Sequence, residues 1–139
     1  MLKLVRQAAV VPIFNNQVVI ITSRSGQRWV LPKGNIEREQ TSQQAAEMEA
    51  WEEAGITGKI SEVALGSFCE KKNEKLYHIT VYTMTVVNVS ERWPEAKQRV
   101  RKLVNLDEVD SFLQSSDMCQ FVQMGFRHFH TEKLVPTGT

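Results

Sequence analysis

The distribution of apolar residues along the chain predicts a series of strands before and after one central helix. Apolar runs at 8–14 and 18–21 are separated by Asn15 and Asn16, which is typical of two strands joined by a tight turn. Polar and apolar residues alternate over 77–82, as expected for a strand with one buried face. The whole pattern predicts strands over 4–14, 18–24, 29–30, 59–70, 76–89 and 99–105.

The segment after position 34 predicts a helix with recognisable ends. The turn sequence 31–34 contains a proline, which fixes φ, and a glycine, which tolerates positive φ. Thr41 or Ser42 can cap the start of the helix, and Gly55 suits the left-handed position that ends one. Two shorter helices are expected to begin at Asp107 or Asp110 and at Asp117, the last running toward His128.

Length and element order together predict an α/β fold in one domain. A chain of 139 residues fits a single domain that can bury a core. We expect this domain to span residues 1–130. The segment 131–139 lacks periodicity and contains Pro136 and Gly138, which predicts a flexible C-terminal tail.

Composition argues against several classes of partner. A net charge of +1 argues against binding to nucleic-acid polymers, which requires a basic excess. No segment approaches the roughly 20 apolar residues that span a bilayer, so no membrane partner is expected. Cys69 and Cys119 are too few for a disulfide framework, which favours a cytoplasmic protein. The sequence leaves a monomer and a homodimer open.

Three carboxylates crowd into one turn of the central helix. Glu49 lies three and four residues before Glu52 and Glu53, and helical side chains at these spacings are neighbours. Like charges so placed repel, so a compensating cation is expected. Hard divalent ions such as Mg²⁺ bind carboxylate oxygens while they contact substrate phosphates. The cluster therefore predicts a metal site for phosphate chemistry, with a solvated acidic helix face as the alternative.

The segment 34–56 resembles the motif of the Nudix hydrolases, G-x5-E-x7-R-E-U-x-E-E-x-G-U, where U is a bulky aliphatic residue. Gln40 stands where the family has Glu, Met48 stands where it has Arg, and Ala50 fills the first U position weakly. The resemblance implies a Nudix-type α/β/α sandwich with a mixed β-sheet. Six positions match the motif in register: Gly34, Glu49, Glu52, Glu53, Gly55 and Ile56.

Gln40 and Met48 occupy the two positions whose family residues pair and steady the carboxylates. Both are replaced together, so no unpaired, partly buried charge is left behind. Changes around metal ligands typically cost about 10- to 100-fold in affinity or activity, so we expect a slower or metal-shifted enzyme. The alternative is a Nudix domain that binds phosphorylated ligands or a partner without turnover.

The resemblance also implies roles for the matched residues. Glu49 and Glu53 would ligate Mg²⁺ or Mn²⁺ together with the Gly34 carbonyl. Glu52 would be the general base that activates water. The three carboxylates lie close enough for these roles to be exchanged, so the identity of the base stays open.

The segments 28–32, 66–70, 91–95 and 99–109 are most similar to the branch that hydrolyses diphosphoinositol and diadenosine polyphosphates. This similarity implies a small-molecule polyphosphate substrate, with a nucleoside triphosphate pyrophosphatase that sanitises modified nucleotides as the alternative. A later loop could supply an additional acid, Glu95 or Glu91. Trp93 is a candidate for stacking on a nucleobase, with a packing role as an equal alternative, whereas Trp51 is expected in the core. The cations expected to bind substrate are Lys33, Arg28, Arg6, Arg99 and Arg101.

Overall fold

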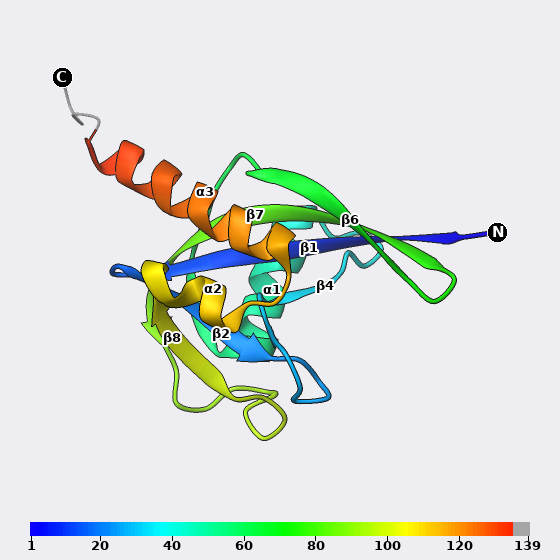
Figure 1. The fold of residues 1–139 in the computed structure, drawn as a ribbon, viewed down its shortest axis with the longest axis horizontal. Coiled ribbons are helices and arrows are strands. Elements are labelled where there is room, and N and C mark those ends of the chain that lie inside the picture. Colours follow the sequence, from blue (N-terminus) through cyan, green and yellow to red (C-terminus); the bar gives the residue numbers. More distant parts are fainter. Residues whose placement is uncertain (135–139) are drawn as a thin grey trace.

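The computed structural model describes residues 1–134, and their side chains as far as position 129 (Figure 1). Within these described residues, eight strands and three helices follow one another, with a 3₁₀ turn (η1) before the second helix. The elements are β1 (Lys3–Phe14), β2 (Gln17–Thr22), β3 (Trp29–Val30), β4 (Lys33–Asn35), α1 (Ser42–Ala54), β5 (Ile56–Ile60), β6 (Gly66–Lys72), β7 (Lys75–Val89), β8 (Arg101–Asn105), η1 (Leu106–Glu108), α2 (Val109–Phe112) and α3 (Ser116–Leu134).

The strands form one mixed sheet around a parallel pair at its centre. β1 and β7 run side by side in parallel, with Ala9 opposite Val81. The sheet order is β3-β2-β1-β7-β5, while β4 pairs with β1, β6 with β7 and β8 with β2, all antiparallel. The register of β4 places Gly34 opposite Ala8. The loop that carries Gly34 is thereby fixed to the central strand.

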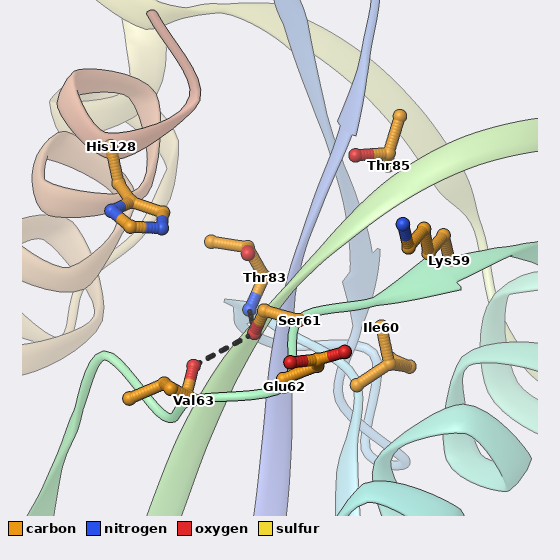
Figure 2. A pocket seen from close by; sticks show the side chains of 8 residues that line it. All are labelled: Lys59, Ile60, Ser61, Glu62, Val63, Thr83, Thr85 and His128. Atoms are coloured by element: carbon orange, nitrogen blue, oxygen red, sulfur yellow. Dashed lines mark hydrogen bonds between the residues drawn. The ribbon is translucent and has the colours of Figure 1, made fainter. Parts of the chain in front are cut away.

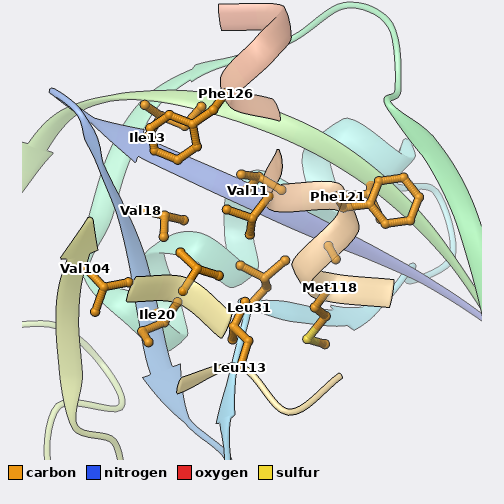
Figure 3. Packing of buried hydrophobic residues seen from close by; sticks show 14 of the residues in the cluster. Val11, Ile13, Val18, Ile20, Leu31, Val104, Leu113, Met118, Phe121 and Phe126 are labelled. Carbon is orange, nitrogen blue, oxygen red and sulfur yellow. The ribbon is translucent and has the colours of Figure 1, made fainter. Parts of the chain in front are cut away.

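The sheet is covered on both faces, which confirms the expected α/β/α sandwich. In Figure 1, α3 crosses in front of β1 and α1 lies behind the sheet. Val11 and Ile20 pack in the cluster on the α2–α3 side, which Figure 3 shows with Phe121 and Phe126 of α3. Val10 and the alanines of α1 form the second cluster. Strands buried on both faces read as continuous apolar runs, as at 8–13.

The sequence of α1 explains both of its ends. The Thr41 side chain accepts a hydrogen bond from the Gln44 N–H at 3.0 Å, and the Gln44 side chain accepts one from the Thr41 N–H at 2.9 Å. This reciprocal capping box satisfies two backbone donors at the start of the helix. Gly55 ends the helix with φ 67°, a conformation that glycine adopts without strain.

The structure differs from the expected elements in three places. The strand expected over 59–70 is two strands, β5 and β6, which both pair with β7 and are separated by the non-strand segment 61–65. Lys33–Asn35, expected as a loop, is the short strand β4. α3 extends to Leu134, so 131–134 of the expected tail is helical, and 135–139 lies outside the described residues. None of the helices in the described part is long and apolar enough to cross a membrane.

Candidate active site

The carboxyl group of Glu49 lies directly against the backbone of Gly34. A Cβ atom added at Gly34 would come within 2.3 Å of the Glu49 carboxyl carbon and of its Oε1. β4 therefore needs glycine here so that Glu49 of α1 can bring its carboxylate to the strand. The structure thus joins two predicted metal ligands that are 15 positions apart in the sequence.

Glu53 is buried beside the same strand, and protein donors orient both of its oxygens. Its side chain is 11% exposed. Oε1 accepts a hydrogen bond from the Lys33 backbone N–H at 3.0 Å, and Oε2 accepts one from Arg99 Nη2 at 3.0 Å. A carboxylate offers about four lone-pair positions, so a cation can still bind Glu53.

Burial and mutual repulsion disfavour ionisation of the two carboxyl groups. Desolvation, followed by the charges of Glu53 and Glu52, raises the pKa of Glu49 to about 8. Desolvation also raises the pKa of Glu53 to about 7, although Arg99 and the Lys33 N–H oppose this shift. The described part of the chain holds no group of three His, Cys, Asp or Glu side chains placed to enclose a metal ion. Mg²⁺ commonly uses one or two carboxylates and completes its shell with water and substrate phosphate.

The segment 90–101 closes over the C-terminal end of α1. The last carbonyl groups of a helix have no partner within it, and here this segment donates to them. Glu52, the expected base, is held by its backbone to Glu95 in this way, and its side chain is half-buried. The pairs are Ser90 N–H to Gly55 O at 2.8 Å, Glu95 N–H to Glu52 O at 3.0 Å, Trp93 Nε1–H to Glu53 O at 2.9 Å and Arg101 Nη1–H to Ala54 O at 2.9 Å.

Two of the expected substrate-binding arginines are engaged within the protein. The side chain of Arg99 is 5% exposed and contacts Glu53 and Glu95. Arg101 donates to the carbonyl groups of Ala54 and Ser90, and its guanidinium lies 4.2 Å from the centre of the Trp93 ring. This placement argues against substrate contact by Arg99 in particular.

Lys33 remains close to the carboxylates, with other cations around it. Its Nζ donates to Gln7 Oε1 at 3.3 Å. Burial lowers the pKa of Lys33; the charges of Glu70 and Glu53 oppose this shift, and the smaller effects of Lys72 and Arg28 add to it. Lys72, at the end of β6, was not predicted to lie near Lys33. Nothing in the sequence indicates that the hairpin formed by β6 and β7 lies beside the motif. Arg28 and Arg6 are exposed.

The two tryptophans lie in different surroundings, and only Trp51 differs from its expected position. Trp93 packs against Gly55, where an added Cβ would lie 2.7 Å from the ring, so it is not an open surface for a nucleobase. Trp51 is 38% exposed rather than in the core, because alanines form the buried face of α1.

The two residues that depart from the motif contact each other. The Gln40 side-chain amide lies 3.4 Å from the sulfur of Met48, and Met48 is 46% exposed. Gln40 Oε1 also accepts a hydrogen bond from the Glu37 N–H at 2.9 Å. A neutral contact therefore occupies the position of the family's ion pair, at the exposed edge of α1.

A separate hollow of about 390 Å³ lies between the β5–β7 edge and α3 (Figure 2). His128 of α3 faces Thr83 of β7 across it, and Ser61 donates to the Val63 carbonyl at its floor. None of the predicted site residues, all of which are described, lines this hollow. It is not the candidate active site.

Comparisons with known proteins agree with this architecture. Nudix hydrolase 16, mitochondrial, of Arabidopsis thaliana is 32% identical over 127 residues, which cover 86% of this chain and 70% of that protein. Diphosphoinositol polyphosphate phosphohydrolase 3-beta of Homo sapiens is 34% identical over 85 residues, 61% of this chain and 51% of that protein. The chain spans about half the length of several curated relatives, among them Nudix hydrolase 4 of Arabidopsis thaliana.

Solved structures share the fold at lower sequence identity. A NUDIX hydrolase from Nitrosomonas europaea superposes with a TM-score of 0.75 at 18% identity, covering 97% of this chain and 94% of that one. The family model of the NUDIX domain matches residues 3–122. Together with the carboxylates of α1 beside Gly34, this match shows that the chain belongs to the Nudix hydrolase family.

Proposed function

We propose that this chain is a divalent-metal-dependent pyrophosphohydrolase that cleaves a phosphoanhydride bond in a nucleoside, dinucleoside or inositol polyphosphate. The observation that carries the proposal is the contact of the Glu49 carboxyl group with the Gly34 backbone, one turn of helix from the oriented Glu53. This arrangement gathers hard oxygen ligands at one point of the sheet.

The residues present fit Mg²⁺ or Mn²⁺. Glu49 and Glu53 offer carboxylate oxygens, and the Gly34 carbonyl lies in the strand that they face. The Glu49 carboxyl group can lie beside this backbone only because Gly34 has no side chain. A bound divalent cation lowers the pKa of water and neutralises charge on phosphoryl oxygens.

The other residues of the chain would carry the proton and bind the substrate. Glu52 is only partly buried beside Glu49, and as general base it would take a proton from the attacking water. Glu95 would be an additional acid beside Glu53. Lys33 and Arg28 would donate charge-assisted hydrogen bonds to phosphate oxygens. The charge of Lys33 interacts with that of Glu53, so a phosphate group held by Lys33 would lie near the carboxylates.

The relatives support a polyphosphate substrate. One group of them is named for diphosphoinositol polyphosphate hydrolysis, and the plant relatives are named only as Nudix hydrolases. The net charge of +1 and the cations around Lys33 favour a small, highly anionic molecule over a nucleic-acid polymer. A cytoplasmic location stays a prediction, and relatives named as mitochondrial occur.

A substrate panel tests this proposal. Diadenosine polyphosphates, nucleoside triphosphates, ADP-ribose and a diphosphoinositol polyphosphate are each incubated with Mg²⁺ or Mn²⁺, and with EDTA. We expect metal-dependent release of phosphate or nucleotide from a polyphosphate, with little preference for the base. Preference for one modified nucleotide would favour a sanitising pyrophosphatase.

The exposed, neutral contact of Gln40 with Met48 favours one second candidate function, a binding module without turnover. In that case Mn²⁺ and a polyphosphate would bind with measurable affinity, and no member of the panel would be hydrolysed. Such a result would overturn the hydrolase and leave the metal site in place.

A further inference from the structure

We propose that Arg99 is a positioning residue of this site, whose guanidinium joins Glu95 of the 90–101 segment to Glu53 of α1 and fixes the Glu53 carboxylate for metal binding. This inference rests on the proposed function. It assigns Arg99 a role different from the substrate contact that the sequence predicts.

The guanidinium of Arg99 bridges three elements. Nε donates to Glu95 Oε1 at 3.0 Å, and Nη2 lies 2.9 Å from the same oxygen. Nη2 also donates to Glu53 Oε2 at 3.0 Å. Nη1 donates to the carbonyl group of Thr22, the last residue of β2, at 3.0 Å. The single guanidinium group of Arg99 therefore connects β2, the 90–101 segment and α1.

The backbone around Arg99 is fixed on both sides. Val100 N–H donates to Thr22 Oγ1 at 2.9 Å, which holds the position after Arg99 to the sheet. Glu95 N–H donates to the Glu52 carbonyl, and the Arg99 N–H donates to the Glu95 carbonyl at 3.1 Å. The turn over 95–99 is therefore held to α1 at its start and to β2 at its end, which fixes the Glu95 side chain next to α1.

Burial makes this arrangement geometrically demanding. The side chains of Arg99, Glu53 and Glu95 are 5%, 11% and 17% exposed. Charge-assisted contacts of a rigid guanidinium fork define direction as well as distance, which an ammonium group does not. Because the Lys33 N–H fixes the other oxygen of Glu53, the plane of that carboxylate is set by two donors.

The positive charge at these carboxylates comes from outside α1. Position 48 of the helix carries an apolar thioether, which contacts the neutral amide of Gln40. Arg99 lies at the start of the chain segment that enters β8, 46 positions from Glu53. The charge that compensates the carboxylate cluster is therefore supplied by a distant segment of the sequence.

Mn²⁺ binding, followed by electron paramagnetic resonance, tests this role without requiring turnover. Arg99→Met removes the bridge, Arg99→Lys keeps the charge without the fork, and Arg92→Met removes an exposed arginine of the same segment. We expect Arg99→Met to weaken Mn²⁺ binding about 10- to 100-fold, Arg99→Lys to weaken it less, and Arg92→Met to leave it unchanged. Wild-type affinity in folded Arg99→Met would overturn the proposal.

A double-mutant cycle with Glu95→Gln separates positioning from general stability. If Arg99 acts by holding Glu95 and Glu53, the loss in Mn²⁺ affinity from Arg99→Met should be smaller once Glu95 is replaced. Additive losses would overturn the coupling. Thermal unfolding identifies any variant that does not fold. If Arg99→Met does not fold, the Mn²⁺ affinities of Arg99→Lys and Glu95→Gln test the proposal instead. Wild-type affinity in both of these variants would contradict it. Failure of the wild-type chain to bind Mn²⁺ would instead overturn the proposed function itself.

Discussion

The carboxyl group of Glu49 occupies the space that a side chain at Gly34 would fill. Gly34 does not have a positive φ, so the backbone of β4 accepts alanine without strain. The clash falls on the end of a flexible side chain, and we expect Glu49 to move rather than the strand. Displacement of a catalytic group by about 1 Å can cost about 100-fold in rate. We predict that Gly34→Ala lowers metal-dependent turnover by about 100-fold with little change in the melting temperature.

Gly26→Ala is the matched control for this prediction. Gly26 has φ +75° and no atoms within 4 Å of an added Cβ. Alanine there should lower the free energy of unfolding by about 1 kcal/mol while turnover stays at the wild-type level. Equal turnover in Gly34→Ala and Gly26→Ala would show that the contact between Glu49 and Gly34 has no catalytic importance.

The raised pKa values of Glu49 and Glu53 predict how stability depends on pH in EDTA. Both folded-state pKa values, about 8 and about 7, lie above the ordinary value of 4.5. The folded state therefore holds protons that the unfolded state has released, so these groups lower the free energy of unfolding as pH rises from about 4.5 to about 8. Urea unfolding at several pH values measures this slope, which Glu49→Gln should reduce.

Mg²⁺ should reverse this trend, because a cation binds the ionised carboxylates and only in the folded state. The rise in melting temperature on adding Mg²⁺ should be larger at pH 8.5 than at pH 5.5. An equal rise at both pH values, or the same pH slope in Glu49→Gln and the wild type, would contradict the assignment of these pKa values.

Trp93 is predicted to stabilise the fold without selecting a nucleobase. Its indole N–H donates to the Glu53 carbonyl, and its ring lies between Gly55 and the guanidinium of Arg101. Trp93→Phe leaves that carbonyl without its donor and should lower the free energy of unfolding by about 1–3 kcal/mol. For two nucleotides that differ only in the base, the ratio of their kcat/KM values should be the same in Trp93→Phe as in the wild type. A changed ratio in a variant of unchanged stability would indicate that Trp93 stacks on the substrate.

Gln40 and Met48 are in contact, so substitutions there should be coupled. Gln40→Glu and Met48→Arg each introduce one unpaired charge at the edge of α1, whereas the double variant introduces an ion pair. We expect the double variant to turn over faster than the two single effects combined predict, with a coupling of about 0.5–3 kcal/mol. Steady-state kinetics on all four proteins measures this coupling. Additive effects would show that the two positions act independently.

The local features of the site could be predicted from the sequence, and its long-range contacts could not. Helical spacing brings Glu49 next to Glu53, and Thr41 and Gly55 mark the ends of α1, as expected. The three residues of β4 are too few to show a strand periodicity, so their pairing with β1 was missed. The apolar residues within 59–70 likewise concealed the break between β5 and β6.

The environment of Arg99 shows intramolecular contacts that the sequence did not predict for this cation. A basic residue near a motif can equally contact the substrate or the motif's own carboxylates, and the sequence does not distinguish these two cases. Which of the two Arg99 contacts depends on how the 90–101 segment packs over α1. This segment donates hydrogen bonds to the free carbonyl groups at the end of the helix. The same packing places Trp93 against Gly55, which is one of the two roles that the sequence left open for this residue.

The most direct test of the central claim is Mg²⁺-dependent phosphate release by Glu53→Gln, compared with Glu47→Gln, which changes an exposed glutamate of the same helix. We predict that Glu53→Gln abolishes turnover of a substrate that the wild type hydrolyses, while the protein remains folded and Glu47→Gln stays fully active. Wild-type turnover in folded Glu53→Gln would contradict the proposal that this buried carboxylate holds the catalytic metal.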